Sequence, residues 1–299
     1  MNKIISFSKT LIHSLGYETL SAYFELTKLR LVLMVLLSTI TGYFLGVQSA
    51  VNLGPFCFTL FGTALVAAGS MALNQYFECE TDSKMIRTQN RPLPSGKIEM
   101  KQAFAFGMTS SAAGFLMLIF GANLLAALCA LLTWAGYLFC YTPLKTKTSL
   151  STIVGAVPGA LPPIIGWASA SGSLNFQSFI LFLIVFFWQL PHFLAIAWMY
   201  RGDYERAGLP MLSVIDKDGK FVARQMILNM CALMPVSLLP TIFHMTGTLY
   251  FFSAFGLGIL FAAVVIYASA NLDQRARYVL RASIIYLGLL LLLMNLDKI

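Results

Sequence analysis

Nine apolar runs, each about as long as a bilayer is thick, restrict the folds open to this sequence. They cover residues 31–49, 55–76, 102–120, 123–141, 151–170, 176–198, 225–243, 248–270 and 280–296. A transmembrane helix needs about 20 mostly apolar residues, and the bilayer satisfies no backbone polar groups outside helices and closed barrels. Charged residues make up 11% of the chain, whereas soluble domains carry roughly 25%. The sequence therefore predicts an all-α polytopic protein with nine transmembrane helices in the lipid bilayer.

The residues ahead of the first run form a separate segment. We divide the chain into an N-terminal segment, residues 1–30, and a single transmembrane domain, residues 31–299. The N-terminal segment lacks the apolar region of a cleavable signal peptide. Its apolar residues recur at helical spacing, which predicts a helix lying on the membrane surface. These residues are Leu11, Ile12, Leu15, Leu20, Tyr23 and Phe24.

The basic residues are distributed on one side of the predicted membrane. Nineteen of the 20 Lys and Arg residues lie in the N-terminal segment and in the loops after runs two, four, six and eight, and Lys298 is the exception. Positively charged loops stay in the cytoplasm. We therefore expect a cytoplasmic N-terminus and an external C-terminus in the plasma (inner) membrane. The same topology accounts for the net charge of +8 without a nucleic-acid partner.

The two most polar loops follow runs two and six, four runs apart. This spacing suggests two four-helix halves plus one further helix, with a central site where the halves meet, open to the cytoplasmic loops. Three prolines in the fifth run, Pro158, Pro162 and Pro163, predict a kink there. The five cysteines form no CxxC pair, which argues against a structural disulfide or a zinc site.

The first polar segment begins with three potential oxygen ligands. Asn74, Glu78 and Asp82 are spaced i, i+4 and i+8, so they share one face if the second helix continues through them. Amide and carboxylate oxygens suit Mg²⁺, which typically takes one or two carboxylates together with substrate phosphate oxygens. Acids four residues apart repel each other unless a cation lies between them. The spacing therefore indicates a Mg²⁺ site, with a solvated charged loop as the alternative.

Basic residues near this segment indicate a phosphate ligand. Arg87 and Arg91 follow the acids, again four residues apart, and arginine suits bidentate phosphate recognition. Acids followed by arginines are expected for a metal–diphosphate complex. Lys145 and Lys147, in the loop after the fourth run, lie on the same predicted membrane face and could add to the site. Their alternative role is to mark the cytoplasmic side.

The second polar segment, residues 188–212, supplies an acid and a histidine. Asp203 follows the sixth run as Glu78 and Asp82 follow the second, and we expect it to contribute a ligand from the other half. His192 lies late in an apolar run, about three helical turns before Asp203. A polar residue inside a membrane helix usually faces a functional cavity. His192 is therefore a candidate base or axial ligand of a haem iron, and the alternative is a histidine hydrogen-bonded within the bundle.

Six stretches of the chain resemble the motifs of one enzyme family. They are NQYFECETD, RTQNRPLPSG, YTPLKTKT, GAVPGALPPIIGW, WQLPHFLAIAW and DYERAGLPML. Together they are similar to the UbiA-type intramembrane prenyltransferases, and most specifically to the protohaem IX farnesyltransferases, from about Tyr23 to the last run. Two positions depart from the wider pattern. Ala207 stands where many UbiA relatives have a second aspartate, as it does in the haem branch, and Leu29 stands where that branch usually has proline.

The resemblance implies a Mg²⁺-dependent reaction of farnesyl diphosphate with protohaem IX. Diphosphate leaves, a vinyl group of the haem attacks the allylic cation, and water completes the product, haem O. It also implies that Asn74, Glu78, Asp82 and Asp203 hold Mg²⁺–diphosphate and that Arg87, Arg91, Lys145 and Lys147 bind phosphate. His192 is then a haem contact or the base that deprotonates water. By analogy alone, the partners include a downstream haem-modifying enzyme or a terminal oxidase.

Two other functions share some of these features. A prenyltransferase for an aromatic quinone precursor would have the same first motif, but the WQLPHF and DYERAG elements argue against it. A transporter of an anionic metabolite would also place its site between repeats. Its pathway should show polar residues along the membrane depth, and most runs here have few.

Overall fold

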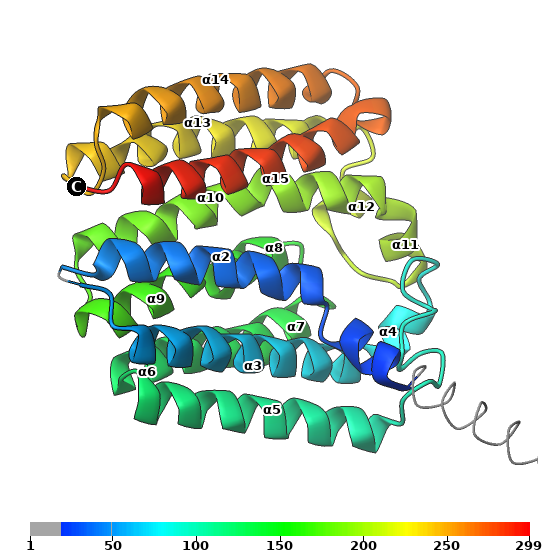
Figure 1. Ribbon diagram of the computed structural model, residues 1–299. Coiled ribbons are helices and arrows are strands. Elements are labelled where there is room, and N and C mark those ends of the chain that lie inside the picture. The colour runs from blue at the N-terminus through cyan, green and yellow to red at the C-terminus, as the bar shows by residue number, and fades with distance from the viewer. Residues whose placement is uncertain (1–18, 49) are drawn as a thin grey trace, which may run out of the picture.

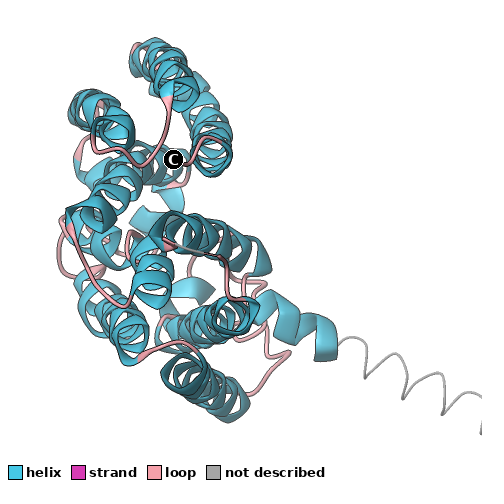
Figure 2. Ribbon diagram, turned by 60° about the vertical axis from the view of Figure 1, so that its left-hand side comes forward, coloured by secondary structure: helices cyan, strands magenta, loops and turns pink. Residues whose placement is uncertain are grey.

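The structure is a computed structural model and describes residues 19–48 and 50–299. Within these ranges, helices and loops make up the whole chain (Figures 1 and 2). Nine of the described helices are long and apolar enough to cross a membrane, which confirms the predicted class and number of spans. Residues 19–26 form a helical segment ahead of the first span. Residues 1–18 of the predicted surface helix lie outside the described residues.

Each span is formed by one helix or by consecutive helical pieces. The first four spans are α2 (Leu29–Gly46), α3 (Leu53–Phe77), α5 (Met100–Gly121), and α6 (Leu124–Ala135) with the π-helix η1 (Gly136–Tyr141) and α7 (Thr142–Leu144). The fifth is α8 (Ser151–Gly159) with α9 (Pro162–Ser171), and the sixth is α10 (Phe176–Met199). The last three are α13 (Lys220–Ile242), α14 (Thr248–Ser269) and α15 (Leu272–Leu296). Short helices α4 (Cys79–Ser83), α11 (Arg201–Arg206) and α12 (Leu212–Ile215) lie in the loops.

The last helix begins earlier than its hydropathy predicts. The predicted run starts at residue 280, whereas α15 begins at Leu272, so Arg275 and Arg277 are helical rather than part of a loop. The Asn271 side chain accepts a hydrogen bond from the Gln274 N–H and caps this charged first turn. Hydropathy does not detect helical turns that contain charged residues, so a prediction from hydropathy alone places the start of such a helix too late.

The fifth span is broken as predicted. Helix α8, which contains Pro158, ends at Gly159, and α9 begins at Pro162, because Pro162 and Pro163 have no N–H to continue the α8 hydrogen-bond ladder but fit the first turn of a new helix. Gln189 of α10 donates a hydrogen bond from Nε2 to the Ala156 carbonyl oxygen, 2.6 Å away, just before the break. The neighbouring helix thus supplies a polar partner where the backbone ladder is interrupted.

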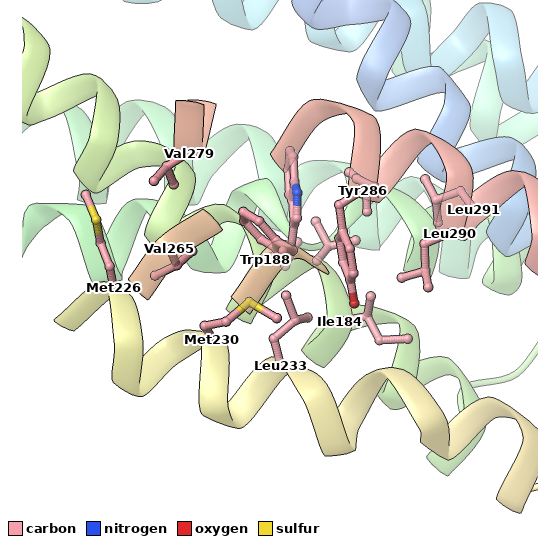
Figure 3. Packing of buried hydrophobic residues seen from close by; sticks show 14 of the residues in the cluster. Ile184, Trp188, Met226, Met230, Leu233, Val265, Val279, Tyr286, Leu290 and Leu291 are labelled. Carbon is pink, nitrogen blue, oxygen red and sulfur yellow. The ribbon is translucent and has the colours of Figure 1, made fainter. Parts of the chain in front are cut away.

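The helices pack in two groups of four. Helices α10, α13, α14 and α15 contact one another, while α2, α3, α5 and α6 form the other group, and the broken fifth span lies between them (Figure 1). The largest buried cluster lies mainly in the first-named group. Figure 3 shows part of it, with Trp188 of α10 near Met230 of α13 and Tyr286 of α15. This packing holds the segment that carries His192.

Small residues let helices α2 and α9 approach closely. A Cβ added at Gly42 would overlap the carbonyl oxygen of Pro163, and one added at Gly166 would overlap that of Thr39. The hydrophobic effect contributes little to the association of helices within lipid, so van der Waals contacts between closely packed backbones provide much of the stabilisation. Gly42 is therefore required by contact with α9 rather than by its own backbone conformation.

Replacing Gly42 with alanine is expected to destabilise the bundle by about 1–3 kcal/mol, the usual cost of overpacking. The matched control is Gly256→Ala in α14, where an added Cβ meets nothing within 4 Å. There, alanine's higher helix propensity should leave stability unchanged or raised by up to about 1 kcal/mol. Thermal unfolding in detergent, followed by helicity, compares the two variants. Equal midpoints would contradict the close α2–α9 contact.

Candidate active site

The two polar segments meet at one end of the bundle, opposite the C-terminus (Figure 1). Asp203 of α11 is buried, and its carboxylate accepts hydrogen bonds from the backbone N–H groups of Ile86 and Arg87, each 3.2 Å away. It also forms an ion pair with Arg206. The structure therefore brings the loop after α3 into direct contact with the loop after α10. Asp203 thus holds this loop through contacts that the sequence pattern alone does not reveal, and its expected role as a Mg²⁺ ligand stays a prediction.

The first three predicted ligands follow one nearly continuous helical path. The Glu78 N–H donates to the Asn74 carbonyl oxygen (2.9 Å), and the Asp82 N–H donates to that of Glu78 (2.7 Å). These are helical i to i+4 bonds, although Glu78 itself adopts a non-helical conformation between α3 and α4. All three side chains are buried. The predicted spacing therefore becomes a row of polar side chains pointing into the protein.

Asn74 is fixed by two side-chain hydrogen bonds. Its Oδ1 accepts from Lys28 Nζ, and its Nδ2 donates to Thr142 Oγ1, both at 3.2 Å. Thr142 in turn donates to the Tyr137 carbonyl oxygen within the π-helical turn η1 (2.9 Å). Such turns are rare and frequently occur at functional sites. This one links the fourth span to the first acidic segment.

Lys28 is a site residue that the sequence pattern assigns only to membrane topology. Burial and the nearby Arg91 lower the pKa of Lys28 to about 7, against the opposing effect of Glu78. Two cations thus lie close enough to disfavour each other's charge, an arrangement suited to an anionic ligand. The signal in the sequence is its position immediately before the first span, which alone does not separate a site residue from a topology marker.

Glu78 and Lys145 form a buried ion pair. Lys145 Nζ lies 3.1 Å and 3.0 Å from the two carboxylate oxygens. Burial by itself would raise the pKa of Glu78, but Lys145 and Lys28 outweigh it and the pKa is lowered. Burial likewise opposes the charge on Lys145, but Tyr141 and Glu78 outweigh it and raise the pKa of the ammonium group. Both groups are therefore charged at neutral pH.

Replacing Lys145 with methionine is expected to destabilise the protein by about 3 kcal/mol, because it leaves a buried carboxylate without its nearest partner. The double variant Glu78→Gln/Lys145→Met removes both charges and should recover most of that loss. Unfolding in a denaturing detergent, followed by circular dichroism, measures both. A double variant no more stable than Lys145→Met would contradict a direct coupling between the two groups.

Asp82 is fully buried and only partly satisfied. Its Oδ2 lies 2.6 Å from Arg91 Nη1, while Oδ1 finds no hydrogen-bond partner among the described residues. Within that part of the chain, no three His, Cys, Asp or Glu side chains gather into a metal-binding group. Mg²⁺, however, requires only one or two protein carboxylates with other oxygen donors. Asn74, Glu78 and the open Oδ1 of Asp82 provide that type of donor set.

The remaining predicted phosphate contacts differ in their surroundings. The Arg87 guanidinium lies 4.6 Å from the centre of the Tyr200 ring and donates to the Tyr204 hydroxyl (3.3 Å). It is exposed at the junction of the two polar segments. Lys147 is also exposed, and its side chain has no ion pair with a described residue. Arg91 and Lys145 thus pair with buried acids, Arg87 contacts two tyrosines, and Lys147 is exposed. The role of each in phosphate binding stays a prediction.

His192 lies in α10, whereas Asp203 lies in the following short helix α11. The two residues are eleven positions apart in the sequence, with the non-helical Tyr200 between them. Its Nδ1 lies 2.7 Å from Ser283 Oγ of α15, and its ring stacks on Trp188 at 5.2 Å. The imidazole is partly exposed. The hydrogen bond that the alternative interpretation requires is therefore present, and the role of His192 at a functional cavity stays a prediction.

A nine-span bundle with buried acids and paired cations at one end is the architecture of an intramembrane prenyltransferase. The model of the UbiA prenyltransferase family matches residues 35–290, and the chain belongs to this family. It is 48% identical over 287 residues to a protein named protoheme IX farnesyltransferase from Solibacter usitatus, covering 92% of this chain and 98% of the relative.

Solved structures show the same fold at lower identity. A digeranylgeranylglyceryl phosphate synthase aligns over 94% of this chain and 98% of its own, with a TM-score of 0.76 and 21% identity. A UbiA homologue from Archaeoglobus fulgidus bound to DMAPP and Mg²⁺ aligns over 91% of this chain and 97% of its own, with a TM-score of 0.67 and 14% identity. These likenesses support the fold of a multi-pass integral membrane protein.

Proposed function

We propose that the protein transfers the farnesyl group of farnesyl diphosphate to a vinyl group of protohaem IX, with addition of water, to give haem O and diphosphate. The observation that carries the proposal is the row Asn74, Glu78 and Asp82, paired with Lys28, Lys145 and Arg91 at one end of an apolar bundle. The name of the Solibacter usitatus relative supports protohaem as the acceptor. The Mg²⁺ and DMAPP bound by the Archaeoglobus fulgidus homologue support a divalent metal with a prenyl diphosphate.

The acids and cations divide the work of binding the diphosphate. Asn74, Glu78 and Asp82 would hold Mg²⁺, with Asp203 keeping the opposite loop against them. When bound, Mg²⁺ neutralises the charge that develops on the leaving diphosphate. Lys28, Lys145 and Arg91, which pair with the first three residues in this structure, then become free to contact phosphate oxygens. Arg87 would add a contact from the loop, and the exposed Lys147 a weaker one.

The apolar part of the site would hold the farnesyl chain and the haem while the bonds between them change. The bond between farnesyl C1 and oxygen breaks, and its electron pair leaves with diphosphate. A vinyl carbon of protohaem then bonds to C1, the positive charge moves to the other vinyl carbon, and water adds there with loss of a proton. The helices surrounding the farnesyl chain keep bulk water from quenching the allylic cation. His192, deeper in α10, would contact the haem iron or take the proton from water.

The proposal also covers the orientation of the protein in the membrane and the proteins that receive its product. The basic end of the bundle faces the cytoplasm of the plasma (inner) membrane and the C-terminus faces outward, following the positive-inside rule. Residues 31–299 act as one transmembrane domain. A downstream haem-modifying enzyme or a terminal oxidase would receive the product, because haem O is too apolar to cross water freely.

The choice of acceptor is the test that separates this function from its rivals. Purified protein in detergent with Mg²⁺ and radiolabelled farnesyl diphosphate should label protohaem and leave an aromatic quinone precursor unlabelled. Labelling of the aromatic acceptor alone would identify the quinone branch. Proteoliposomes that move the diphosphate across the membrane without labelling either acceptor would instead identify a transporter.

A further inference from the structure

The hydrogen bonds around Ser283 determine which nitrogen of His192 carries the proton. Ser283 lies in α15 and is fully buried. Its hydroxyl contacts two groups, the Leu280 carbonyl oxygen at 2.8 Å and His192 Nδ1 at 2.7 Å. A hydroxyl has one proton to donate, and a carbonyl oxygen only accepts. With the Ser283 hydroxyl donating to the Leu280 carbonyl oxygen, Ser283 Oγ is left to accept a hydrogen bond from Nδ1–H of His192.

The same serine also fixes the orientation of the histidine ring. Trp188 donates from Nε1 to the Ser283 backbone oxygen, 2.7 Å away, and its indole stacks on His192 with 27° between the ring planes. Figure 3 shows Trp188 packed in the cluster formed with α15. One residue of the ninth span thus holds both Trp188 and His192 of the WQLPHF motif. His192 Nε2 has no hydrogen bond to any residue that the structure describes.

We infer that Ser283 is a positioning residue that keeps His192 in its Nδ1–H tautomer, with the lone pair of Nε2 available to the substrate. This inference rests on the proposed function for what Nε2 contacts, but the tautomer itself does not. A second partner on the far nitrogen is the usual way in which proteins set the tautomer of a metal-binding histidine. Either proposed role, ligand of the haem iron or acceptor of a proton from water, uses the lone pair on Nε2.

Nitrogen spectroscopy without haem tests the tautomer directly. The variant His13→Gln/His244→Asn leaves His192 as the single histidine, and asparagine suits position 244 because its φ is 55°. Solid-state NMR of ¹⁵N,¹³C-histidine in lipid identifies Nδ1 by its bond to Cγ. We expect a proton on Nδ1 and none on Nε2. A proton on Nε2 would overturn the inference, and this outcome needs no change at Ser283.

Replacing Ser283 with alanine should then change the tautomer. We expect the preference for Nδ1–H to fall at least about tenfold, comparable to the loss of metal affinity when a ligating histidine loses its hydrogen-bond partner. The matched control is Ser237→Ala in α13, since Ser237 is equally buried and makes the same i−3 bond, to Met234 at 2.8 Å, without contact to His192. An unchanged tautomer in the Ser283 variant would overturn the inference.

Haem titration separates this inference from the proposed function. Ser283→Ala should weaken protohaem binding about tenfold, and Ser237→Ala should leave it unchanged. If His192→Ala binds protohaem as the unmodified protein does, the proposed iron contact fails while a measured Nδ1–H tautomer still stands. If His192→Ala loses haem but His192 carries its proton on Nε2, the haem contact stands and the role of Ser283 fails.

Discussion

Replacing Asp82 with asparagine is expected to reduce farnesyl transfer about 10²–10³-fold, the range seen when one preorganised electrostatic contact to the transition state is removed. The physical reason lies in the two carboxylate oxygens. One is paired with Arg91 at 2.6 Å, and the other is buried without a partner among the described residues. Asparagine has nearly the same shape but no charge, so it weakens the metal site and leaves Arg91 uncompensated. Steady-state kinetics with protohaem and farnesyl diphosphate should show the loss mainly in kcat.

The matched control for this variant lies two residues away. Glu80 is in the same short helix and pairs with Lys84 at 2.8 Å, but its side chain is 86% exposed. Glu80→Gln removes an equal charge outside the site and should retain near-normal turnover. Both proteins should show the same elution profile and unfolding midpoint. Equal activity of the Asp82 and Glu80 variants would contradict the assignment of the acidic row.

Replacing His192 with alanine is expected to lower kcat/KM for protohaem by about 10²–10⁴-fold, the usual contribution of a general base. The KM for farnesyl diphosphate should stay unchanged, because the contacts of His192 are with Ser283, Trp188 and Phe193 rather than with the residues proposed to bind the diphosphate. Haem titration distinguishes the two roles. An iron contact predicts weaker haem binding, whereas a base predicts normal binding with a slow or altered addition of water.

The control for His192 is His244→Asn. His244 follows α13 at the opposite end of the bundle from the acids, at a positive φ that asparagine tolerates. This variant should keep normal kinetics with both substrates. A His192→Ala protein that folds, binds protohaem and farnesylates it at the normal rate would remove His192 from the site altogether.

The fold was largely predictable because membrane helices are encoded locally. Apolar runs predicted all nine spans, and three prolines predicted the break between α8 and α9. The beginning of α15 was missed by eight residues because its first two turns are charged. What determined that start was a capping asparagine, Asn271, a signal that hydropathy ignores.

The candidate site was predictable only where its residues lie close in sequence. The i, i+4, i+8 spacing of Asn74, Glu78 and Asp82 survives as consecutive helical hydrogen bonds. The contacts of Lys28 with Asn74 and of Ser283 with His192 span 46 and 91 residues. No local pattern encodes such pairs, because they arise from how the helices pack. Lys145 and Lys147 show the same limit, since two lysines two positions apart differ in burial and only Lys145 pairs with Glu78.

The most direct test of the account is the mass of the haem product. Purified protein is incubated with Mg²⁺, farnesyl diphosphate and protohaem IX, once in ordinary water and once in H₂¹⁸O. The account predicts a product heavier than protohaem by one farnesyl group and one water, with ¹⁸O incorporated in the second reaction and no product when Mg²⁺ is chelated. Unchanged protohaem in protein that binds both substrates, or a farnesylated haem without added water, would contradict it.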